Sequence, residues 1–494
     1  MGHRSTEHSQ HFDVSRACLS VDAGPNIAAS LRALGIGLSE VDGIFHTHCH
    51  DDHFCGLATL LRSDRRLKYW ATPLVRHSVM KKLAALVGIH GDRLDEYFDF
   101  HDLHFGHWND VEGLEVMPLF SPHPVETNIF IFRTMWIGEY RTYAHFADIS
   151  SLDVLREMIV DDPKAPGISQ VTFEKVCSDY YTSADIKKLD IGGGMIHGNV
   201  FDFIDDSSGK LILAHTSRPL TNEEKTVGSG APFGTVDVLI SANQDYAWRY
   251  AYEFLRSYFP SVSASQIRIL MNNQKKLFNP ETILIRQGTP VRAIYLVLTG
   301  SVEIINSATN VCNTVSAGSL LGELTGLHGL PAIETCRAAS FVEAMCLPCD
   351  LYLEFVKRND LFASISRLSE YRDFLTCSRL CGEITTTASL NRIAATLSRL
   401  LLNKQTRISS SLRGFVSLIK SGQVLRLIDD RVVETIGPGD FFGEDVAIYE
   451  TPLKHRLEVS TPTDIYMIPP DVIKNIPGVR WKLLEAFQRR RTYA

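Results

Sequence analysis

The sequence contains no run of about 18 consecutive apolar residues, so it predicts no transmembrane helix. The stretch from Met1 to Asp13 is polar and has no apolar centre, which argues against a secretory signal peptide. A strong excess of one charge is also lacking: the net charge of −7 over 494 residues argues against binding of nucleic acid through the overall charge of the protein. The ten cysteines show no repeated spacing, so they fit reduced thiols better than a disulfide framework, and we expect a cytoplasmic protein.

At 494 residues the chain is too long for a single hydrophobic core. Its apolar content of 45% and charged content of 22% are those of globular proteins. Alternating strands and helices in the first half predict an α/β layered fold, whereas the second half contains two similar runs of short strands separated by glycine turns. The sequence therefore predicts three domains, at residues 1–245, 246–380 and 381–494.

The densest polar segment runs from Phe45 to Leu57 and carries four histidines and two aspartates in thirteen residues. An apolar strand leads directly into it. Strand alternation places His48 and His50 on one side, and Asp52 and His53 follow on a turn. Imidazoles and carboxylates that converge in this way can hold a divalent cation, so we interpret the segment as a metal site rather than a polar loop.

This segment resembles the signature of the metallo-β-lactamase fold, Thr-His-x-His-x-Asp-His-x-x-Gly. The positions that match are Thr47, His48, His50, Asp52, His53 and Gly56. The resemblance implies an αββα sandwich that binds two divalent metal ions, with zinc expected first and iron or manganese as alternatives. It implies that His48 and His50 bind one cation. Asp52 and His53 would bind the other, and Asp22 would support the metal loops from the end of an early strand.

Three further residues match the remaining ligand positions of the resembled fold. His123 lies between two prolines that restrict its backbone, in a gap between two apolar runs. Asp148 follows a predicted strand, where the family places a carboxylate that bridges both metals. The alternative is that Asp148 caps the next helix, a role that Ser150 could fill instead. His215 follows the apolar strand predicted at Lys210 to Ala214, where the family places its last histidine ligand.

The segment from Asp190 to Gly198 contains three consecutive glycines, which permit a close approach of the backbone. His197 follows them. It could donate a proton to a leaving group, or it could be a structural histidine, and both interpretations stay open. We expect Asp52 and His197 to be the catalytic residues. Arg218 could bind a phosphate with both arms of its guanidinium, although a surface role is more common for arginine.

The second half resembles two cyclic-nucleotide-binding domains, each a β-roll barrel with flanking helices. In that family a turn offers backbone N–H groups to the cyclic phosphate, and its glutamate holds the ribose hydroxyl. The matching residues are Gly322 and Glu323 in the first copy, and Phe442, Gly443 and Glu444 in the second.

Neither copy keeps the arginine with which the resembled family neutralises the phosphate. Alignment on the return strands places Ala332 there in the first copy and His455 in the second, with Arg337 and Arg456 close by. A buried phosphate without its cation loses a charge-assisted pair of about 1.5–3 kcal/mol. Ligand binding and a purely packing or dimerising role therefore both stay open, and we expect His455 to support binding below about pH 6.5, the unperturbed imidazole pKa.

We therefore expect an α/β metallo-β-lactamase-like domain followed by two regulatory cyclic-nucleotide-binding-like barrels. The predicted activity is hydrolysis by a hydroxide held between two metals, on a phosphodiester first and on a thioester or another acyl substrate second. Expected partners are that substrate, a cyclic nucleotide and a second copy of the chain, but no membrane. Two alternatives are a di-iron redox or oxygen-sensing protein, against which His50 argues because that branch tends to carry glutamate there, and a non-catalytic cyclic-nucleotide sensor.

Overall fold

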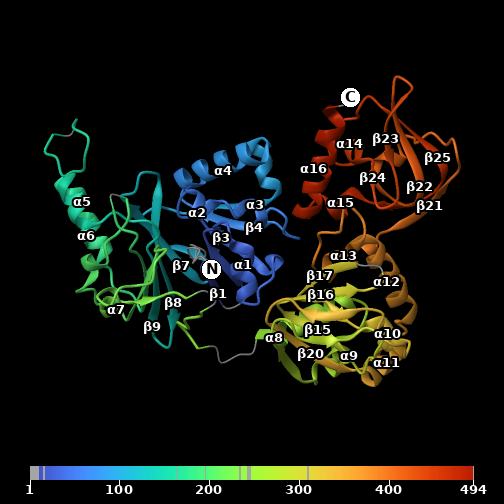
Figure 1. The fold of residues 1–494 in the computed structure, drawn as a ribbon, viewed down its shortest axis with the longest axis horizontal. Coiled ribbons are helices and arrows are strands. Elements are labelled where there is room, and N and C mark those ends of the chain that lie inside the picture. The colour runs from blue at the N-terminus through green and yellow to red at the C-terminus, as the bar shows by residue number, and fades with distance from the viewer. Residues whose placement is uncertain are drawn as a thin grey trace. The chain divides into compact units, whose positions relative to one another are not determined.

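The computed structural model describes residues 10–14, 17–162, 164–194, 196–232, 235–241, 246–308 and 311–492. The chain forms two compact units, coloured blue to green and green to red along the chain in Figure 1. Unit 1 comprises residues 1–34, 41–60 and 67–244, and unit 2 comprises residues 35–40, 61–66 and 245–494. The structure is of mixed α/β class, as expected. The division into three domains stays a prediction.

Unit 1 contains a five-stranded sheet in the order β1-β2-β3-β4-β5. Its strands are β1 (Gln10–Val14), β2 (Ala17–Val21), β3 (Val41–Phe45), β4 (Leu67–Ala71) and β5 (Phe98–Asp102). β1 pairs antiparallel with β2, and the other neighbours are parallel. The helices between these strands are α1 (Ile27–Ala33), α2 (Asp51–Phe54), α3 (Leu57–Leu60) and α4 (Pro73–Val87). The chain leaves helical geometry after α1, at Gly35, whose φ is +74°.

The second sheet of unit 1 has seven strands in the order β12-β11-β10-β9-β8-β7-β6. Its strands are β6 (Asn109–Val111), β7 (Leu114–Ser121), β8 (Thr127–Trp136), β9 (Glu139–His145), β10 (Ile186–Asp190), β11 (Lys210–Ala214) and β12 (Ser229–Gly230). β6 to β9 pair antiparallel, whereas β9 to β12 run parallel. The accompanying helices are α5 (Leu152–Glu157), α6 (Gln170–Tyr180) and α7 (Glu224–Val227).

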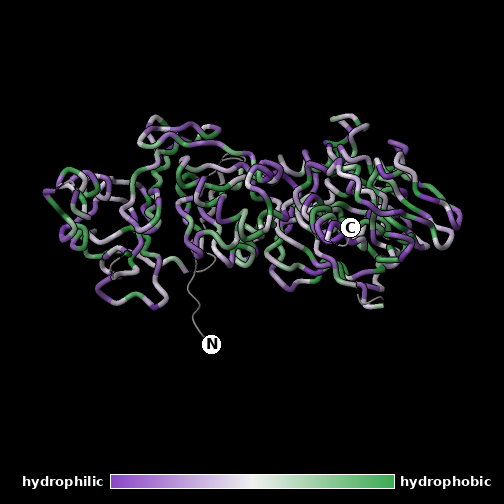
Figure 2. Tube along the Cα trace, turned by 90° about the horizontal axis from the view of Figure 1, so that it is seen from above, coloured by the Kyte–Doolittle hydropathy of each residue, from purple (hydrophilic) through white to green (hydrophobic). Residues whose placement is uncertain are grey.

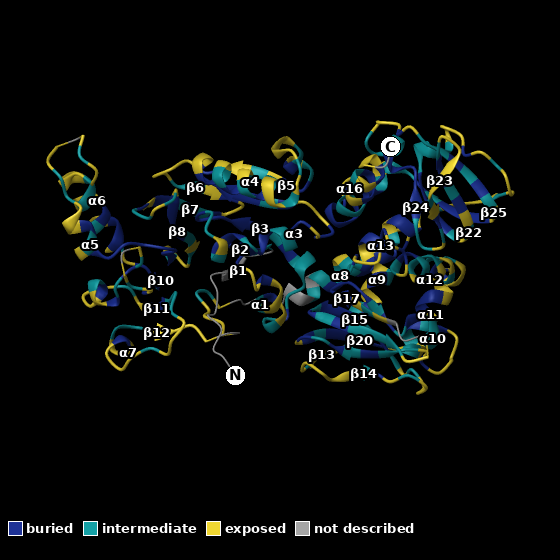
Figure 3. Cartoon of the chain, turned by 45° about the horizontal axis from the view of Figure 1, so that its top comes forward, coloured by how far each residue is buried: buried dark blue, intermediate teal, exposed yellow. Residues whose placement is uncertain are grey.

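The two sheets of unit 1 enclose one apolar core, and the helices form another against the outer face of the second sheet. Phe45 and Trp70 from the first sheet pack with Phe130 and Phe132 from the second. On the other face, α5 and α6 bury Leu155, Tyr180 and neighbouring side chains against β8, β9 and β10. Most residues of β8 and β10 are buried, whereas Figure 3 shows an exposed face on α4. This layering brings the ends of both sheets to one edge, where the predicted metal loops lie.

Unit 2 begins with α8 (Tyr246–Tyr258) and α9 (Ala264–Met271). Two four-stranded antiparallel sheets follow, in the orders β13-β20-β15-β18 and β14-β19-β16-β17. The strands are β13 (Lys275–Phe278), β14 (Ile283–Ile285), β15 (Ala293–Thr299), β16 (Ser301–Asn306), β17 (Val311–Ser316), β18 (Leu320–Leu321), β19 (Thr335–Ala338) and β20 (Val342–Pro348). The helices are α10 (Glu323–Leu327), α11 (Cys349–Arg358), α12 (Phe362–Thr376) and α13 (Thr387–Ala394).

The rest of unit 2 contains one five-stranded antiparallel sheet, in which β24 pairs with β22 beside the order β21-β25-β22-β23. Its strands are β21 (Ser398–Leu402), β22 (Val416–Ile428), β23 (Arg431–Ile436), β24 (Phe441–Phe442) and β25 (Arg456–Ile468). The helices are α14 (Glu444–Ala447), α15 (Pro470–Ile473) and α16 (Pro477–Thr492). β21 follows α13 and pairs antiparallel with β25. The number of barrels stays a prediction.

Apolar and polar segments alternate along the Cα trace (Figure 2). Among the helices of the described residues, none is long and apolar enough to cross a membrane. No disulfide joins cysteines within the described part of the chain.

The packing predicts that Phe45→Ala will lower the free energy of unfolding by about 3–5 kcal/mol, the usual cost of removing a buried phenyl group. The Phe45 ring lies 5.0 Å from Trp70 and 5.1 Å from Phe132, measured between ring centroids, and it is fully buried. Phe105→Ala is the matched control, because Phe105 is 52% exposed and its loss should change stability by less than about 0.5 kcal/mol. Denaturant unfolding of the full chain measures both, and equal effects would contradict the assignment of Phe45 to the core.

Candidate metal centre

The predicted site residues come from loops at the carboxyl ends of strands in both sheets of unit 1. His48, His50, Asp52 and His53 follow β3. Asp148 follows β9, Asp190 ends β10 and His215 follows β11, while His123 lies in the turn between β7 and β8. Ligand sites of open α/β sheets lie outside the carboxyl ends of the strands, so this placement is the expected one for a site.

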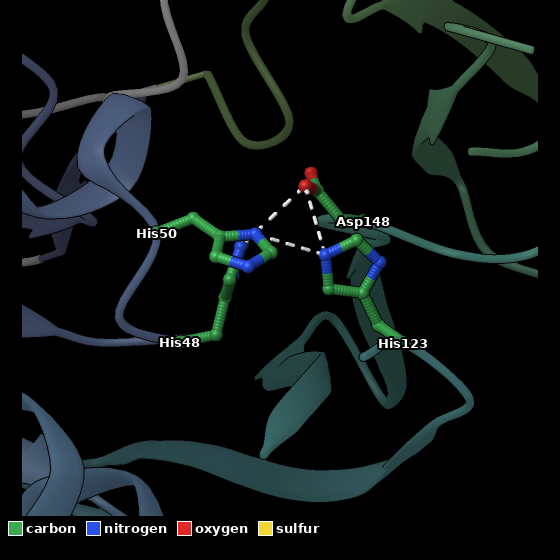
Figure 4. A group of neighbouring side chains, drawn as sticks. All are labelled: His48, His50, His123 and Asp148. Carbon is green, nitrogen blue, oxygen red and sulfur yellow. Dashed lines mark hydrogen bonds and ion pairs between the residues drawn. The ribbon is translucent and has the colours of Figure 1, made fainter. Parts of the chain in front are cut away.

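His48, His50, His123 and Asp148 form the first group (Figure 4). His50 Nδ1 lies 3.0 Å from His123 Nε2. Asp148 Oδ2 lies 3.4 Å from His48 Nε2 and 3.5 Å from His123 Nε2. Donor atoms on a tetrahedron around zinc, with bonds of about 2.0–2.1 Å, are about 3.3 Å apart. The spacing of these four donors therefore fits one cation.

Asp52, His53, Asp148 and His215 form the second group. Asp148 Oδ1 lies 3.1 Å from His53 Nε2 and 3.5 Å from His215 Nε2, and His215 Nε2 lies 3.2 Å from Asp52 Oδ2. Asp148 thus presents one carboxylate oxygen to each group, which is the geometry expected of a bridging ligand. The structure brings all seven predicted ligands into one cluster that could hold metal ions. Their assignment as ligands stays a prediction.

The chemistry of the donors fits divalent cations. Burial lowers the pKa values of His48 and His50, and it lowers that of His123 to about 4, so these rings are neutral near pH 7 and keep a lone pair for a metal. His48 Nε2 and Asp148 Oδ1 are both fully buried, so solvent does not satisfy either atom. Burial opposes the charged form of His53 too, but Asp22 and Asp148 outweigh it and raise the pKa to about 10, so the metal-free ring carries a proton that a cation would displace.

Asp22 supports this cluster from the end of β2, as the resemblance implied. Its carboxylate accepts hydrogen bonds from the Thr47 backbone N–H at 2.7 Å, from the Thr47 hydroxyl at 2.6 Å and from His53 Nδ1 at 2.7 Å. The bond to Nδ1 fixes the His53 tautomer and turns Nε2 toward Asp148. Burial opposes ionisation of Asp22, but the charge and hydrogen bond of His53 hold its pKa below the ordinary value.

Asp190 is a site residue that sequence reasoning missed, although it was named as the start of the glycine segment. Its carboxylate accepts hydrogen bonds from His197 Nδ1 at 3.1 Å and from the backbone N–H groups of Ile149, Gly192 and Gly198. The hydrogen bond that His197 donates to Asp190 is the main cause that raises the pKa of His197. The signal that could have found it is its position at the end of a strand, similar to that of Asp148, which follows one.

His197 lies beside the second group, with its ring centroid 4.1 Å from that of His215 and Nδ1 3.9 Å from Asp148 Oδ2. The ring is partly exposed, so it can reach a bound substrate. Its Nδ1 is directed to Asp190, which leaves Nε2 for proton transfer. A proton-donating role for His197 stays a prediction.

One local expectation needs correction. The N-cap of α5 is Ser151, whose side chain accepts a hydrogen bond from Val154, whereas the Ser150 hydroxyl donates to the Pro122 carbonyl. Of the two alternatives for Arg218, the structure favours the surface role, because its guanidinium binds the Glu224 carboxylate at 2.6 and 2.8 Å.

Both predicted ribose-binding glutamates lie in internal hydrogen-bond networks. Glu323 is 4% exposed, accepts a hydrogen bond from the Tyr352 hydroxyl and pairs with Arg372 of α12 at 3.1 Å. Glu444 is 1% exposed and accepts two bonds from Arg490 of α16, at 2.9 and 2.8 Å. Gly322 and Gly443 precede them in left-handed geometry, with φ of +75° and +96°. Sequence reasoning missed both arginines, because each lies far along the chain.

The predicted phosphate positions are apolar or uncharged in the structure. Ala332 is buried and lies nine residues after Glu323, directly after a proline. The same spacing from Glu444 reaches Leu453, which also follows a proline, and so favours Leu453 over His455 for this position. Burial lowers the pKa of His455 to about 4, so the expected gain of charge below pH 6.5 is wrong.

The nearby arginines that could have replaced the missing cation are paired with carboxylates. Arg337 contacts Glu303 and Glu281, and Arg456 contacts Asp430 and Glu458. Neither guanidinium is therefore a spare charge for a ligand phosphate.

Known proteins resemble both halves of the chain. Residues 275–359 match the family model described as cyclic nucleotide-binding domain, and residues 10–145 match the model described as anti-Pycsar protein Apyc1. The cGMP-dependent 3′,5′-cGMP phosphodiesterase A of Dictyostelium discoideum is 22% identical over 499 residues, which cover 96% of this chain and 56% of that protein. The cAMP/cGMP-dependent 3′,5′-cAMP/cGMP phosphodiesterase B of the same organism is 20% identical over 337 residues, which cover 64% and 30%.

This chain therefore matches little more than half of one relative's length and about a third of the other's. Among solved structures, the metallo-β-lactamase fold protein YhfI from Bacillus subtilis is 16% identical, with 45% of this chain and 86% of that chain covered and a TM-score of 0.33. The chain thus contains a cyclic nucleotide-binding domain and is similar to cAMP/cGMP phosphodiesterases and to a metallo-β-lactamase fold structure.

Proposed function

We propose that this chain is a binuclear metal-dependent phosphodiesterase whose second half regulates it. The observation that carries the proposal is Asp148, which presents one oxygen to each of two His/Asp groups. Two cations that share one carboxylate ligand can both contact the same phosphate, and they lower the pKa of a water molecule between them. The similarity to phosphodiesterases supports the same substrate class, and their names make 3′,5′-cyclic nucleotides the first substrates to test.

Each group of residues would have a separate role in the reaction. The first group would hold one cation and the second group the other, with Asp148 shared. Asp52, the more exposed carboxylate of the second group, would also orient the attacking water and accept its proton. His197, held by Asp190, would donate a proton to the leaving oxygen.

The first test is metal content. We expect close to two divalent cations per purified chain by elemental analysis, and we expect His48→Ala and His123→Ala each to lose metal and activity together. His104→Ala is the control, since His104 is an exposed histidine outside both groups and its loss should leave the metal content unchanged. Full metal content in both ligand variants would show that the site is wrongly assigned. A visible spectrum of the same sample separates zinc from the di-iron alternative.

The second test is the reaction itself. We expect hydrolysis of a phosphodiester such as cAMP or cGMP, abolished by chelator and restored by added metal. His197→Ala should lower kcat by about a hundredfold or more, the usual worth of a positioned proton donor, while metal content stays at the level of the unmodified protein. Thioester hydrolysis without any phosphodiester turnover would overturn the substrate class, and loss of metal from His197→Ala would instead make His197 a structural or ligating residue.

For the regulatory half we propose weak cyclic-nucleotide binding and a second candidate ligand, an uncharged ribonucleoside. The observation that favours the second candidate is that both copies keep the glutamate but place Ala332 and Leu453 where a phosphate would need a cation. A carboxylate has about four lone-pair sites, so Glu323 can still accept a ribose hydroxyl beside its bonds to Tyr352 and Arg372. The missing pair weakens cyclic-nucleotide binding by about ten- to a hundredfold.

Calorimetry on the chelator-treated full chain tests this expectation without hydrolysis of the ligand. We expect cAMP and cGMP to bind more weakly than sub-micromolar, and adenosine or guanosine to bind at least as well as its cyclic nucleotide. Ala332→Arg should raise the affinity for cAMP by about tenfold and leave that for adenosine unchanged. Tight cAMP binding by the unmodified protein would show that another residue neutralises the phosphate.

A further inference from the structure

Lys82 contacts the segment that carries the first four predicted ligands, and it does so from another element. It lies on α4, thirty-three residues after Cys49. Its ammonium donates to the Cys49 carbonyl at 2.7 Å and to Asp51 Oδ1 at 2.5 Å, and it lies 4.7 Å from the centre of the Phe54 ring. One side chain thus fixes three points of the turn between His48 and Cys55.

The positions of these contacts matter because they alternate with the ligands. Cys49 and Asp51 flank His50, and Asp51 directly precedes Asp52. His50 caps the N-terminus of α2 in extended geometry, with φ −66° and ψ +154°. The orientation of the Cys49 carbonyl sets the peptide plane that precedes His50, so the bond from Lys82 restricts where the His50 ring can point.

The buried ligands His48 and His53 and the more exposed ligands His50 and Asp52 are held in place by different contacts. His48 and His53 are fully buried, and hydrogen bonds link them to Thr47 and Asp22. The Asp52 side chain is 40% exposed, and His50 is only half-buried. His50 and Asp52 therefore depend more on the backbone of the turn, which is the part that Lys82 contacts.

We propose that Lys82 is a positioning residue for the candidate metal centre, one that holds the turn so that His50 and Asp52 keep the geometry their cations require. The inference rests on the proposed metal-dependent function. Lys82 touches no reacting group; it acts through the backbone at Cys49 and through Asp51. An ordinary exposed ion pair contributes little to the free energy of unfolding, so the expected effect is on metal affinity rather than on stability.

The charge of Lys82 complicates a single substitution. Removing the ammonium leaves the carboxylate of Asp51 unpaired, and that negative charge would attract a cation and mask lost positioning. The double variant Lys82→Met with Asp51→Asn removes both charges and leaves the net charge unchanged. Lys82→Arg keeps a cation with donors for both the carbonyl and the carboxylate. Lys81→Met is the matched control, because Lys81 is the exposed neighbour on the same helix.

The experiment measures the apparent dissociation constants for zinc and for manganese, by chelator competition on the full-length protein, in all variants. We expect the double variant to bind metal about ten- to a hundredfold more weakly, as is usual when a group that orients the ligands is lost. Lys82→Arg and Lys81→Met should stay within about threefold of the unmodified protein, less than the usual effect of such a loss. The melting temperature of the chelated protein serves as the structural readout.

Two results would overturn the inference. The first is an unchanged metal affinity in the double variant of a protein that binds two cations, which would reject the role of Lys82 alone; a lowered melting temperature of the chelated double variant would then make Lys82 merely structural. The second is that the unmodified protein binds no metal, in which case the proposed function would fail together with the inference.

Discussion

The geometry of unit 1 depends on the buried carboxylate of Asp22. Asp22 directly follows β2, and its carboxylate accepts hydrogen bonds from Thr47 and His53, which follow the neighbouring strand β3. The backbone reinforces the same link, since Ala23 donates to the His53 carbonyl and Gly56 donates to the Ala23 carbonyl. A side chain on Gly56 would lie 2.1 Å from the Gly24 carbonyl oxygen, so only glycine permits this approach. The same contacts therefore fix both the register of β2 against β3 and the orientation of the segment that carries the first four predicted ligands.

The buried carboxylates around this segment need positive charge nearby. Asp22, Asp148 and Asp190 are all nearly fully buried at the centre, whereas three of the neighbouring histidines have lowered pKa values. Carboxylates packed this closely repel one another unless positive charge lies between them. In the metal-free chain, protonated His53 supplies part of that positive charge. Lys188 is a further buried amine near these acids, but burial lowers its pKa. A divalent cation in each group would supply the rest, so metal binding and folding of these loops should be coupled.

How far the sequence predicts the site depends on how local each signal is. The histidines of the β3 turn were predictable because they lie within six residues of one another, and Asp148 and His215 because each follows a predicted strand. The bounds of β11, Lys210–Ala214, were predicted to the residue. Asp190 ends a strand in the same way but was hidden by the glycines after it. Lys82 could not be found, because nothing in the spacing of α4 indicates that its ammonium reaches a turn thirty-three residues away.

The second half shows why a matching motif does not by itself identify a ligand. Glu323 and Glu444 match the ribose-binding position, yet each is held by an arginine from a later helix, Arg372 on α12 and Arg490 on α16. A buried carboxylate needs such a partner whether or not a ligand binds, because an unpaired buried charge is strongly destabilising. The glutamate is thus explained by stability alone, and its presence does not separate a binding domain from a packing one. The residue that does separate them is the one after the proline. An arginine at that position would pair with a ligand phosphate, but Ala332 and Leu453 occupy it in the two copies, so neither copy supplies the cation.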